Sequence, residues 1–478
     1  MFIIGFVCYF LIVGLISLAS YLQGKKQRNT QYSEAILGGR SINYFLTALS
    51  AQASDMSDWL FMAFPAAIFV GGMPNAWIAI GLISGMFLTW HFLAQPLRKE
   101  TERYNTFTLS SYFEKRFNDT TNILRFLSAV LSLLFFSVYI AAGLKGFGFL
   151  AESIFSIPYI LGTLIAILCT VSYIFLGGYK ALAWIDCFQA IFLLTVIFLV
   201  PFLALKYIGG CSEIIKSATE KGISLNLFSD NIFTFLNTIL LSFSWAMGYF
   251  GTPHILTKFM GINDEKAVKK AKYVGMTWQI SVLSAAGFIG LIAIAFFPEN
   301  LINKELVFVE MVKILFNPLA AGFMLSAVAG ATVSVMTAQM LVVVSIITED
   351  FYKNIIKPKA TEKELLLAYR FSIIIISILS FLVSLDKQSS IQSLVQYAWI
   401  GFGSSFGPLV WLSLYSKTIN KFGAIASMIT GSLMAIFWQK YLQYSIFLHY
   451  GLDIPAVIPG FILSILCAYM VSYMTKGK

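Results

Sequence analysis

Long apolar runs separated by short polar segments recur along the whole chain. A helix that spans a bilayer needs about 20 apolar residues, and runs of about this length predict thirteen spans. They cover residues 2–22, 43–72, 75–96, 123–150, 158–177, 183–208, 231–256, 274–297, 318–348, 366–385, 390–416, 424–439 and 453–475. The first run lacks a basic flank, so we expect a retained helix rather than a signal peptide. The pattern predicts an all-α polytopic membrane protein, with no connection long enough for a separate soluble domain.

Two of these spans contain polar or Gly/Pro interruptions. The second carries "ASDMSDW", which includes Asp55 and Asp58, and the seventh carries "SWAMGYFGTPH". Unpaired backbone is costly in hydrocarbon, so unwound segments survive only where protein or a water-filled cavity surrounds them. We therefore predict that the helices unwind near residues 53–58 and 245–251.

The two interruptions lie five spans apart. In transporters built from inverted repeats, broken helices at matching positions of the two halves hold the binding site. This spacing predicts a single transporter domain with two five-helix repeats. The expected parts are 1–42 (first helix and inner loop), 43–208 (first repeat), 209–416 (second repeat) and 417–478 (two C-terminal helices).

The distribution of charge predicts how the chain is oriented in the membrane. Only 12% of residues are charged, and most of the 33 Lys and Arg residues fall in the connections that are inside if the N-terminus is outside. Basic residues concentrate in cytoplasmic loops, so we expect the N-terminus outside and the C-terminus inside. The net charge of +10 then belongs to a surface beside anionic lipid, and no nucleic-acid partner is expected. The five cysteines, an odd number, imply no disulfide framework.

Three acidic residues fall within the apolar runs: Asp55, Asp58 and Asp186. A charge at the centre of a membrane helix costs about 2.5–3.5 kcal/mol on insertion scales, so such residues are functional candidates. Asp186 is the weakest, because a carboxylate near a helix end can stay hydrated. The three histidines, His91, His254 and His449, lack partners at metal-ligand spacing. We expect no metal centre of that kind, and only His254 falls near the proposed path.

Several blocks of the sequence match one known family. In chain order they include "GGRSINYFLTALSAQASDMSDW", "PLRKETERYNTFTLSSYFEKRF", "LLFFSVYIAAG", "GYFGTPHIL", "ILFNPLAAGFMLSA", "ITEDFYK" and "YAWIGFGSSFGPL". Through these blocks the chain resembles the sodium/solute symporter family nearly end to end. The resemblance implies a LeuT-like five-plus-five inverted-repeat fold. It also implies sodium-driven import of a small amino acid, L-proline first, by a monomer in the bacterial cytoplasmic (inner) membrane. A membrane enzyme fits the sequence least, because no nucleophile–base or metal constellation falls among the helices.

The resemblance also implies where the coupling cation binds. The Na⁺ ligands would come from the unwound helix and from the ninth span opposite, with Asp55 adding charge: Ala53, Met56, Ala331 and Ser334. Oxygen ligands suit Na⁺, a hard cation, and unwinding frees backbone carbonyls to supply them. A second cation position, as in some family members, would use Asp186, Ser334 and Thr337.

The chain departs from the proline-transporting members of the family at two positions. They have a hydroxyl residue where this chain has Val335, and Gly where it has Asp58. Either Asp58 rebuilds the sodium site, or a proton replaces sodium, or coupling is lost. We rank the rebuilt sodium site first and proton coupling second.

For the substrate, the family pattern points to residues around both interruptions: Asp55, Ser57, Trp59, Tyr139, Trp245, Tyr249 and Pro253. Aromatic rings can bury a pyrrolidine ring, although most aromatic residues, 16% of this chain, pack or lie at interfaces. Arg40 resembles the basic residue of the family's inner gate. Other readings stay open: a transporter of another small organic solute, such as pantothenate, a sugar or sialic acid, and a membrane sensor without transport.

Overall fold

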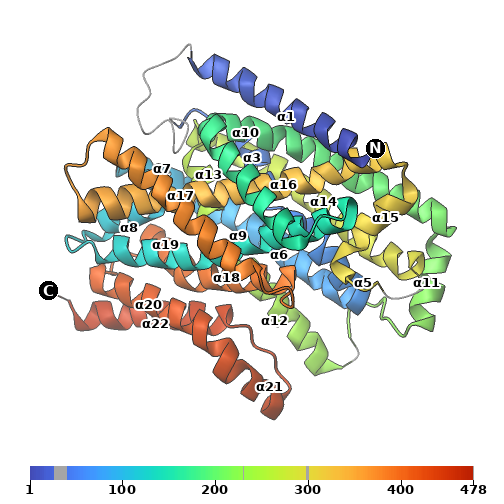
Figure 1. Ribbon diagram of the computed structural model, residues 1–478. Coiled ribbons are helices and arrows are strands. Elements are labelled where there is room, and N and C mark those ends of the chain that lie inside the picture. The colour runs from blue at the N-terminus through green and yellow to red at the C-terminus, as the bar shows by residue number, and fades with distance from the viewer. Residues whose placement is uncertain (26–39, 230, 298–300, 477–478) are drawn as a thin grey trace.

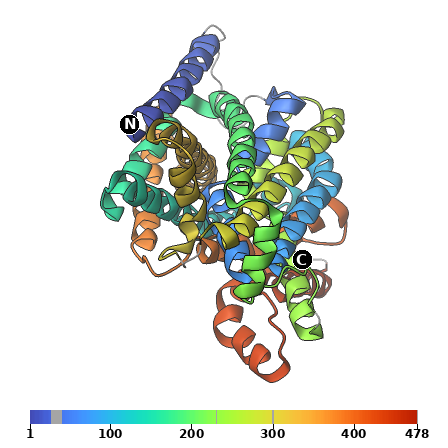
Figure 2. The same cartoon turned by 90° about the vertical axis from the view of Figure 1, so that its right-hand side faces the viewer.

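The computed structural model is a bundle of helices (Figure 1), and an isolated backbone bridge joins Ile42 and Ile262. The structure describes residues 1–25, 40–229, 231–297 and 301–476, without the side chains of 17–25 and 175–181. Lys26, Arg28 and Lys478, three of the basic residues expected on the inner face, lie outside these ranges. The N-terminal helix and the C-terminal helices lie on opposite sides of the bundle (Figure 1, Figure 2).

The helices follow the apolar runs, with additional short segments between them. The first part of the chain forms α1 (Phe2–Lys25), α3 (Tyr44–Ala53), α4 (Asp58–Phe61), α5 (Ala63–Gly71), η2 (Met73–Asn75), α6 (Ala76–Leu88), η3 (Thr89–Ala94), α7 (Gln95–Arg103), α8 (Leu109–Phe117), α9 (Ile123–Phe155), α10 (Tyr159–Ile208) and α11 (Cys211–Glu220). The remainder forms α12 (Ile232–Gly248), α13 (Pro253–Met260), η4 (Glu265–Ala267), α14 (Val268–Phe296), η5 (Lys304–Leu306), α15 (Val307–Leu315), α16 (Pro318–Ser345), η6 (Ile346–Ile356), α17 (Glu362–Ser384), α18 (Ile391–Ser405), α19 (Gly407–Tyr415), α20 (Lys421–Trp438), η7 (Gln439–Gln443), α21 (Tyr444–Tyr450) and α22 (Val457–Met474).

The expected count of thirteen spans is not confirmed. Within the described residues, eight helices are long and apolar enough to cross a bilayer, or nine if α12 and α13 form one bent span. The expected spans 43–72 and 390–416 are each divided into shorter helices, so no single piece reaches spanning length. The expected spans 158–177 and 183–208 are joined within α10. Length and hydropathy locate the apolar runs, but they do not reveal where a run is interrupted or continued.

The first interruption lies where the sequence predicts it. α3 ends at Ala53 and α4 begins at Asp58, so the intervening four residues are not helical. Ser57 caps α4, because its hydroxyl oxygen accepts the backbone N–H of Trp59 at 3.3 Å. The predicted unwinding near 53–58 is therefore confirmed.

The second interruption also exists, but it begins later than expected. α12 continues through Trp245 to Gly248, and α13 starts at Pro253 after a bend of 46°. A Cβ atom at Gly251 would lie 2.1 Å from the carbonyl oxygen of Phe402, so only glycine allows this approach of α18. Proline suits the first turn of α13, because it lacks an N–H that would have no helical partner there.

α16 passes through the middle of the bundle and contacts α1, α9 and α10. Its small residues allow this close packing: a Cβ atom at Gly322 would lie 2.3 Å from the carbonyl oxygen of Phe2. α16 also contacts α3 and α4 on either side of the first interruption. The fold thus brings the ninth apolar run next to the first broken helix.

Candidate functional site

A small cavity lies between the two interruptions. Its lining comes from the α3–α4 break, α6, α9, the end of α12 and α18: Asp55, Met56, Trp59, Leu82, Tyr139, Trp245, Tyr249, Val395 and Trp399. Five of the seven residues that the sequence predicts for substrate binding are therefore brought together here.

Asp55 is the acidic residue of this cavity. Its Oδ2 accepts a hydrogen bond from the Tyr249 hydroxyl at 2.5 Å. That hydroxyl accepts one from Gln279 Nε2 at 3.0 Å, and Gln279 Oε1 accepts one from Gln52 Nε2 at 3.4 Å. This chain of hydrogen bonds joins the first break to the second through α14 and orients the carboxylate.

Aromatic rings form most of the remaining wall. The ring centroids of Trp59 and Trp245 lie 5.2 Å apart, and Tyr249 meets Trp399 edge-on at 4.7 Å. Trp399 Nε1 donates to the carbonyl oxygen of Trp245 at 2.8 Å, which ties α18 to α12. The buried Nε1 of Trp245 has no hydrogen-bond partner among the described residues. An unpaired buried donor of this kind is available to a bound ligand.

Two predicted substrate residues do not line this cavity. The Ser57 oxygen caps α4, and Pro253 lines a second cavity beside His254. Sequence reasoning missed Trp399, although it lies in the family block "YAWIGFG", and missed Gln279, an isolated polar residue in an apolar run. Polarity within α14 was a usable signal for Gln279.

The predicted sodium ligands lie on two packed segments. Ala53 ends α3, and Met56 lies within the break, while Ala331 and Ser334 are buried one turn apart on α16. Among the described residues, no backbone N–H donates to the carbonyls of Ala53 or Met56. Such carbonyl and hydroxyl oxygens fit the preference of Na⁺ for oxygen ligands.

The predicted second cation position already holds a side-chain cation. Asp186 accepts hydrogen bonds from the hydroxyls of Ser334 and, at 2.6 Å, Ser50, and it forms an ion pair with Lys258 at 3.1 Å. Thr337 instead donates to the carbonyl oxygen of Val333 at 2.6 Å. The sequence therefore identified Asp186 and Ser334 but not Ser50 or Lys258.

Asp58 lies against α9. A Cβ atom at Gly146 would be 1.6 Å from Asp58 Oδ2, so the glycine makes room for the carboxylate. Ser57 and the Trp59 N–H approach the carboxylate, but neither of its oxygens has a partner with hydrogen-bond geometry among the described residues. The carboxylate is buried, with 1% of the residue exposed. A buried acid without a partner is costly and therefore a candidate for a bound cation or proton.

Gly146→Ala is expected to destabilise the protein by about 1–3 kcal/mol through overpacking. In an Asp58→Gly background the same change should cost much less, because the obstructing carboxylate is gone. Thermal unfolding of the purified single and double variants measures this coupling. Gly14→Ala is the control, since nothing lies within 4 Å of a Cβ atom there. An equal loss in both backgrounds would refute the contact.

Arg40 lies before α3 with a positive φ of 53°, which is uncommon for a non-glycine residue. Its Nη2 donates to the carbonyl oxygens of Thr101 and Thr106, at 2.9 and 2.8 Å. Burial and the nearby Arg98 lower the pKa of Arg40 to about 10, while Glu102 opposes the shift. Arg40 thus stays charged at neutral pH and ties the start of α3 to α7 and to the segment that follows it.

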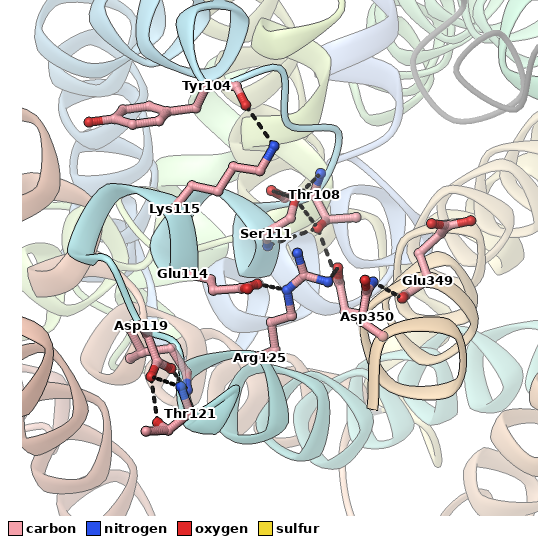
Figure 3. A network of polar contacts seen from close by, with 12 residues as sticks. Tyr104, Thr108, Ser111, Glu114, Lys115, Asp119, Thr121, Arg125, Glu349 and Asp350 are labelled. Atoms are coloured by element: carbon pink, nitrogen blue, oxygen red, sulfur yellow. Dashed lines mark hydrogen bonds and ion pairs between the residues drawn. The ribbon is translucent and has the colours of Figure 1, made fainter. Parts of the chain in front are cut away.

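A further polar network lies at α8, α9 and η6 (Figure 3). Arg125 forms ion pairs with Glu114 of α8 and, at 3.8 Å, with Asp350 of η6. The Thr108 hydroxyl donates to Asp350 at 2.7 Å. The sequence did not predict these contacts, which fasten the short helix α8 to two long helical segments.

Comparisons with known proteins agree with this arrangement. The profile of the "Sodium:solute symporter family" matches residues 35–431. The chain is 37% identical over 475 residues to sodium/proline symporters of Staphylococcus aureus, among them those of strains RF122 / ET3-1 and JH9. These alignments cover 98% of this chain and 91% of each relative.

Solved structures share the fold at low sequence identity. A substrate-bound, outward-open Na⁺-coupled sialic acid symporter superposes with a TM-score of 0.76, at 15% identity and with 98% of this chain and 97% of that chain covered. MhsT in complex with L-phenylalanine superposes with a TM-score of 0.57, at 14% identity and with coverage of 91% and 98%. The predicted LeuT-like transporter fold is thereby confirmed.

The family match spans both interruptions and α16, which carry the candidate cation and substrate residues. The chain is a multi-pass membrane transporter rather than an enzyme, and Na⁺ is its coupling ion. On the extent of the family match and the identity to its relatives, the chain belongs to the sodium:solute symporter family.

Proposed function

We propose that the chain imports a small amino acid, L-proline first, together with Na⁺. The observation that carries this proposal is the aromatic cavity at the two helix breaks, with Asp55 in its wall. Tryptophan and tyrosine rings bury an apolar ring and attract an ammonium group through cation–π interaction. The 37% identity to sodium/proline symporters supports the choice of proline.

The proposed binding mode uses both charged ends of the amino acid. The substrate ammonium faces Asp55, whose orientation the Tyr249 hydroxyl supports. The substrate carboxylate takes the Nε1–H of Trp245, which lies in the cavity wall and is unpaired within the described residues. Na⁺ is held by the predicted oxygens of the first break and α16, beside Asp55.

The proposed pathway runs through a single chain in the bacterial cytoplasmic membrane. The N-terminus is outside and the C-terminus inside, as the basic connections predict. The two interruptions belong to two inverted repeats, residues 43–208 and 209–416. Rocking of one part against the other would open the cavity to each side in turn.

Uptake into proteoliposomes tests the proposal. We expect radiolabelled proline to accumulate when an inward sodium gradient is imposed and to remain at equilibrium when only a proton gradient is imposed. Unlabelled pantothenate, sugar or sialic acid should not compete. Accumulation driven by the proton gradient alone, or inhibition by one of those solutes and not by proline, would contradict the proposal.

A further inference from the structure

Four helices meet at Asp186 in the interior of the protein. The carboxylate belongs to α10, Ser50 to α3, Ser334 to α16 and Lys258 to α13. Each of these residues is at most 4% exposed. Four segments distant in the sequence thus converge on one buried carboxylate.

Asp186, Ser50 and Lys258 contact one another, and Ser334 adds a second hydroxyl at the carboxylate. Lys258 Nζ lies 3.1 Å from Asp186 Oδ2 and donates to Ser50 Oγ at 2.8 Å. Ser50 Oγ donates to the same Oδ2 at 2.6 Å, and Ser334 Oγ donates to Oδ1. One carboxylate and two hydroxyls are oxygen ligands suited to a monovalent ion. In this chain the ammonium group of Lys258 lies beside these oxygens.

Charge balance makes that ammonium necessary. An unpaired carboxylate buried among helices is strongly destabilising, and removing one partner of a buried ion pair costs about 3–5 kcal/mol. A bound Na⁺ and a lysine ammonium carry the same charge, so either one can compensate Asp186. The site therefore requires one cation, which the chain supplies itself.

We propose that Lys258 is a resident cation that takes the place of a second Na⁺ at Asp186, so that each substrate molecule is coupled to one Na⁺. The inference rests on the proposed function, because it assumes that the coupling Na⁺ binds at Ala53, Met56, Ala331 and Ser334. Lys258 is then the residue that sets the ion stoichiometry. Ser334 belongs to both cation positions. Loss of the ammonium group should therefore also change Na⁺ binding at the first position.

Lys258 also borders a cavity. It lines the second cavity together with His254, Thr257 and Ser345. The lysine side chain reaches from this cavity to Asp186. A shorter or neutral side chain at position 258 would leave the carboxylate accessible to a cation that enters the cavity.

Lys258→Met tests the proposal, because methionine keeps much of the apolar stem without the charge. In proteoliposomes with ²²Na⁺ and radiolabelled substrate, the native chain should move about one Na⁺ per substrate, with a Hill coefficient for Na⁺ of about one. Lys258→Met should move about two, with a Hill coefficient above one. A ratio of two in the native chain, or an unchanged ratio in an active Lys258→Met, would overturn the proposal.

Two further variants separate the charge from other effects. Lys258→Arg keeps the charge and should keep the ratio of one. Lys258→Met combined with Asp186→Asn removes both charges, and the ratio should return to about one. A ratio of two in this double variant would show that Asp186 does not hold the added ion.

A substrate-free measurement applies if Lys258→Met does not transport or if proline is not the substrate. The thermal unfolding temperature of purified Lys258→Met should rise more steeply with Na⁺ than that of the native chain, because an added site stabilises by mass action. The double variant with Asp186→Asn should lose the added rise. An identical Na⁺ dependence in all three proteins would overturn the proposal, whereas failure of proline uptake by the native chain would refute only the substrate assignment.

Discussion

Asp55→Asn is expected to lower the initial rate of sodium-driven uptake at least about 30-fold. The carboxylate lines the aromatic cavity, and the Tyr249 hydroxyl orients it at 2.5 Å. Loss of one partner of a buried charge interaction costs about 2 kcal/mol or more, and an asparagine provides no charge for Na⁺ or for a substrate ammonium. Insertion should not suffer, because a charged residue in a membrane helix is itself unfavourable.

Initial rates of radiolabelled uptake, normalised to the amount of protein in the membrane, measure this effect. Tyr249→Phe is the matched control: it removes the hydroxyl that donates to Asp55 and keeps the carboxylate. We expect a smaller loss for this control than for Asp55→Asn. Normal uptake with normal sodium dependence in Asp55→Asn would show that the carboxylate has a structural role only.

Asp58→Gly is expected to have the second largest effect and to abolish most sodium-driven uptake. The resemblance to the family implies a glycine at the position of Asp58 and a hydroxyl residue at the position of Val335. If Asp58 supplies the oxygen missing at Val335, Asp58→Gly combined with Val335→Thr should restore uptake. Thr332 and Met336 of α16 lie beside Gly143 of α9. Gly146, which lies beside Asp58, is three residues further along α9, a distance of about one helical turn.

The alternative is that Asp58 carries a proton. Its carboxylate is buried against Gly146 without a completed hydrogen bond in the described part of the chain. In that case uptake would follow a pH gradient without sodium, and Asp58→Asn would abolish that drive. Initial rates measured against sodium at fixed pH, and against pH without sodium, distinguish the two roles. A rate indifferent to both gradients would exclude both of them.

Much of the candidate site could be predicted without coordinates. Asp55 and Trp59 stand out because a polar or broken segment inside an apolar run is costly unless it serves a site. Tyr249 and Trp245 stand out because they flank the Gly/Pro interruption. The existence of both breaks needed only local residue chemistry, although the second begins later than the sequence predicts.

The contacts that Trp399 and Gln279 make could not be predicted in the same way. Trp399 is one of nine tryptophans in the chain, and its place in the wall depends on α18 packing against α12 at Gly248, where a Cβ atom would overlap the indole. Gln279 belongs to the site because α14 passes beside the first break. From there its side chain donates a hydrogen bond to the Tyr249 hydroxyl. Neither contact produces a periodic pattern of residues in the sequence.

The sequence by itself determined that this protein crosses the membrane many times, that two of its helices are broken, and that carboxylates and aromatic rings lie at or near the breaks. These features follow from local hydropathy and backbone chemistry, which neighbouring residues dictate. Only the tertiary structure shows which cation lies beside Asp186. Lys258 is 72 residues away along the chain and Ser50 is 136 residues away, so only the packing of four helices could show that an ammonium group occupies a place expected for sodium.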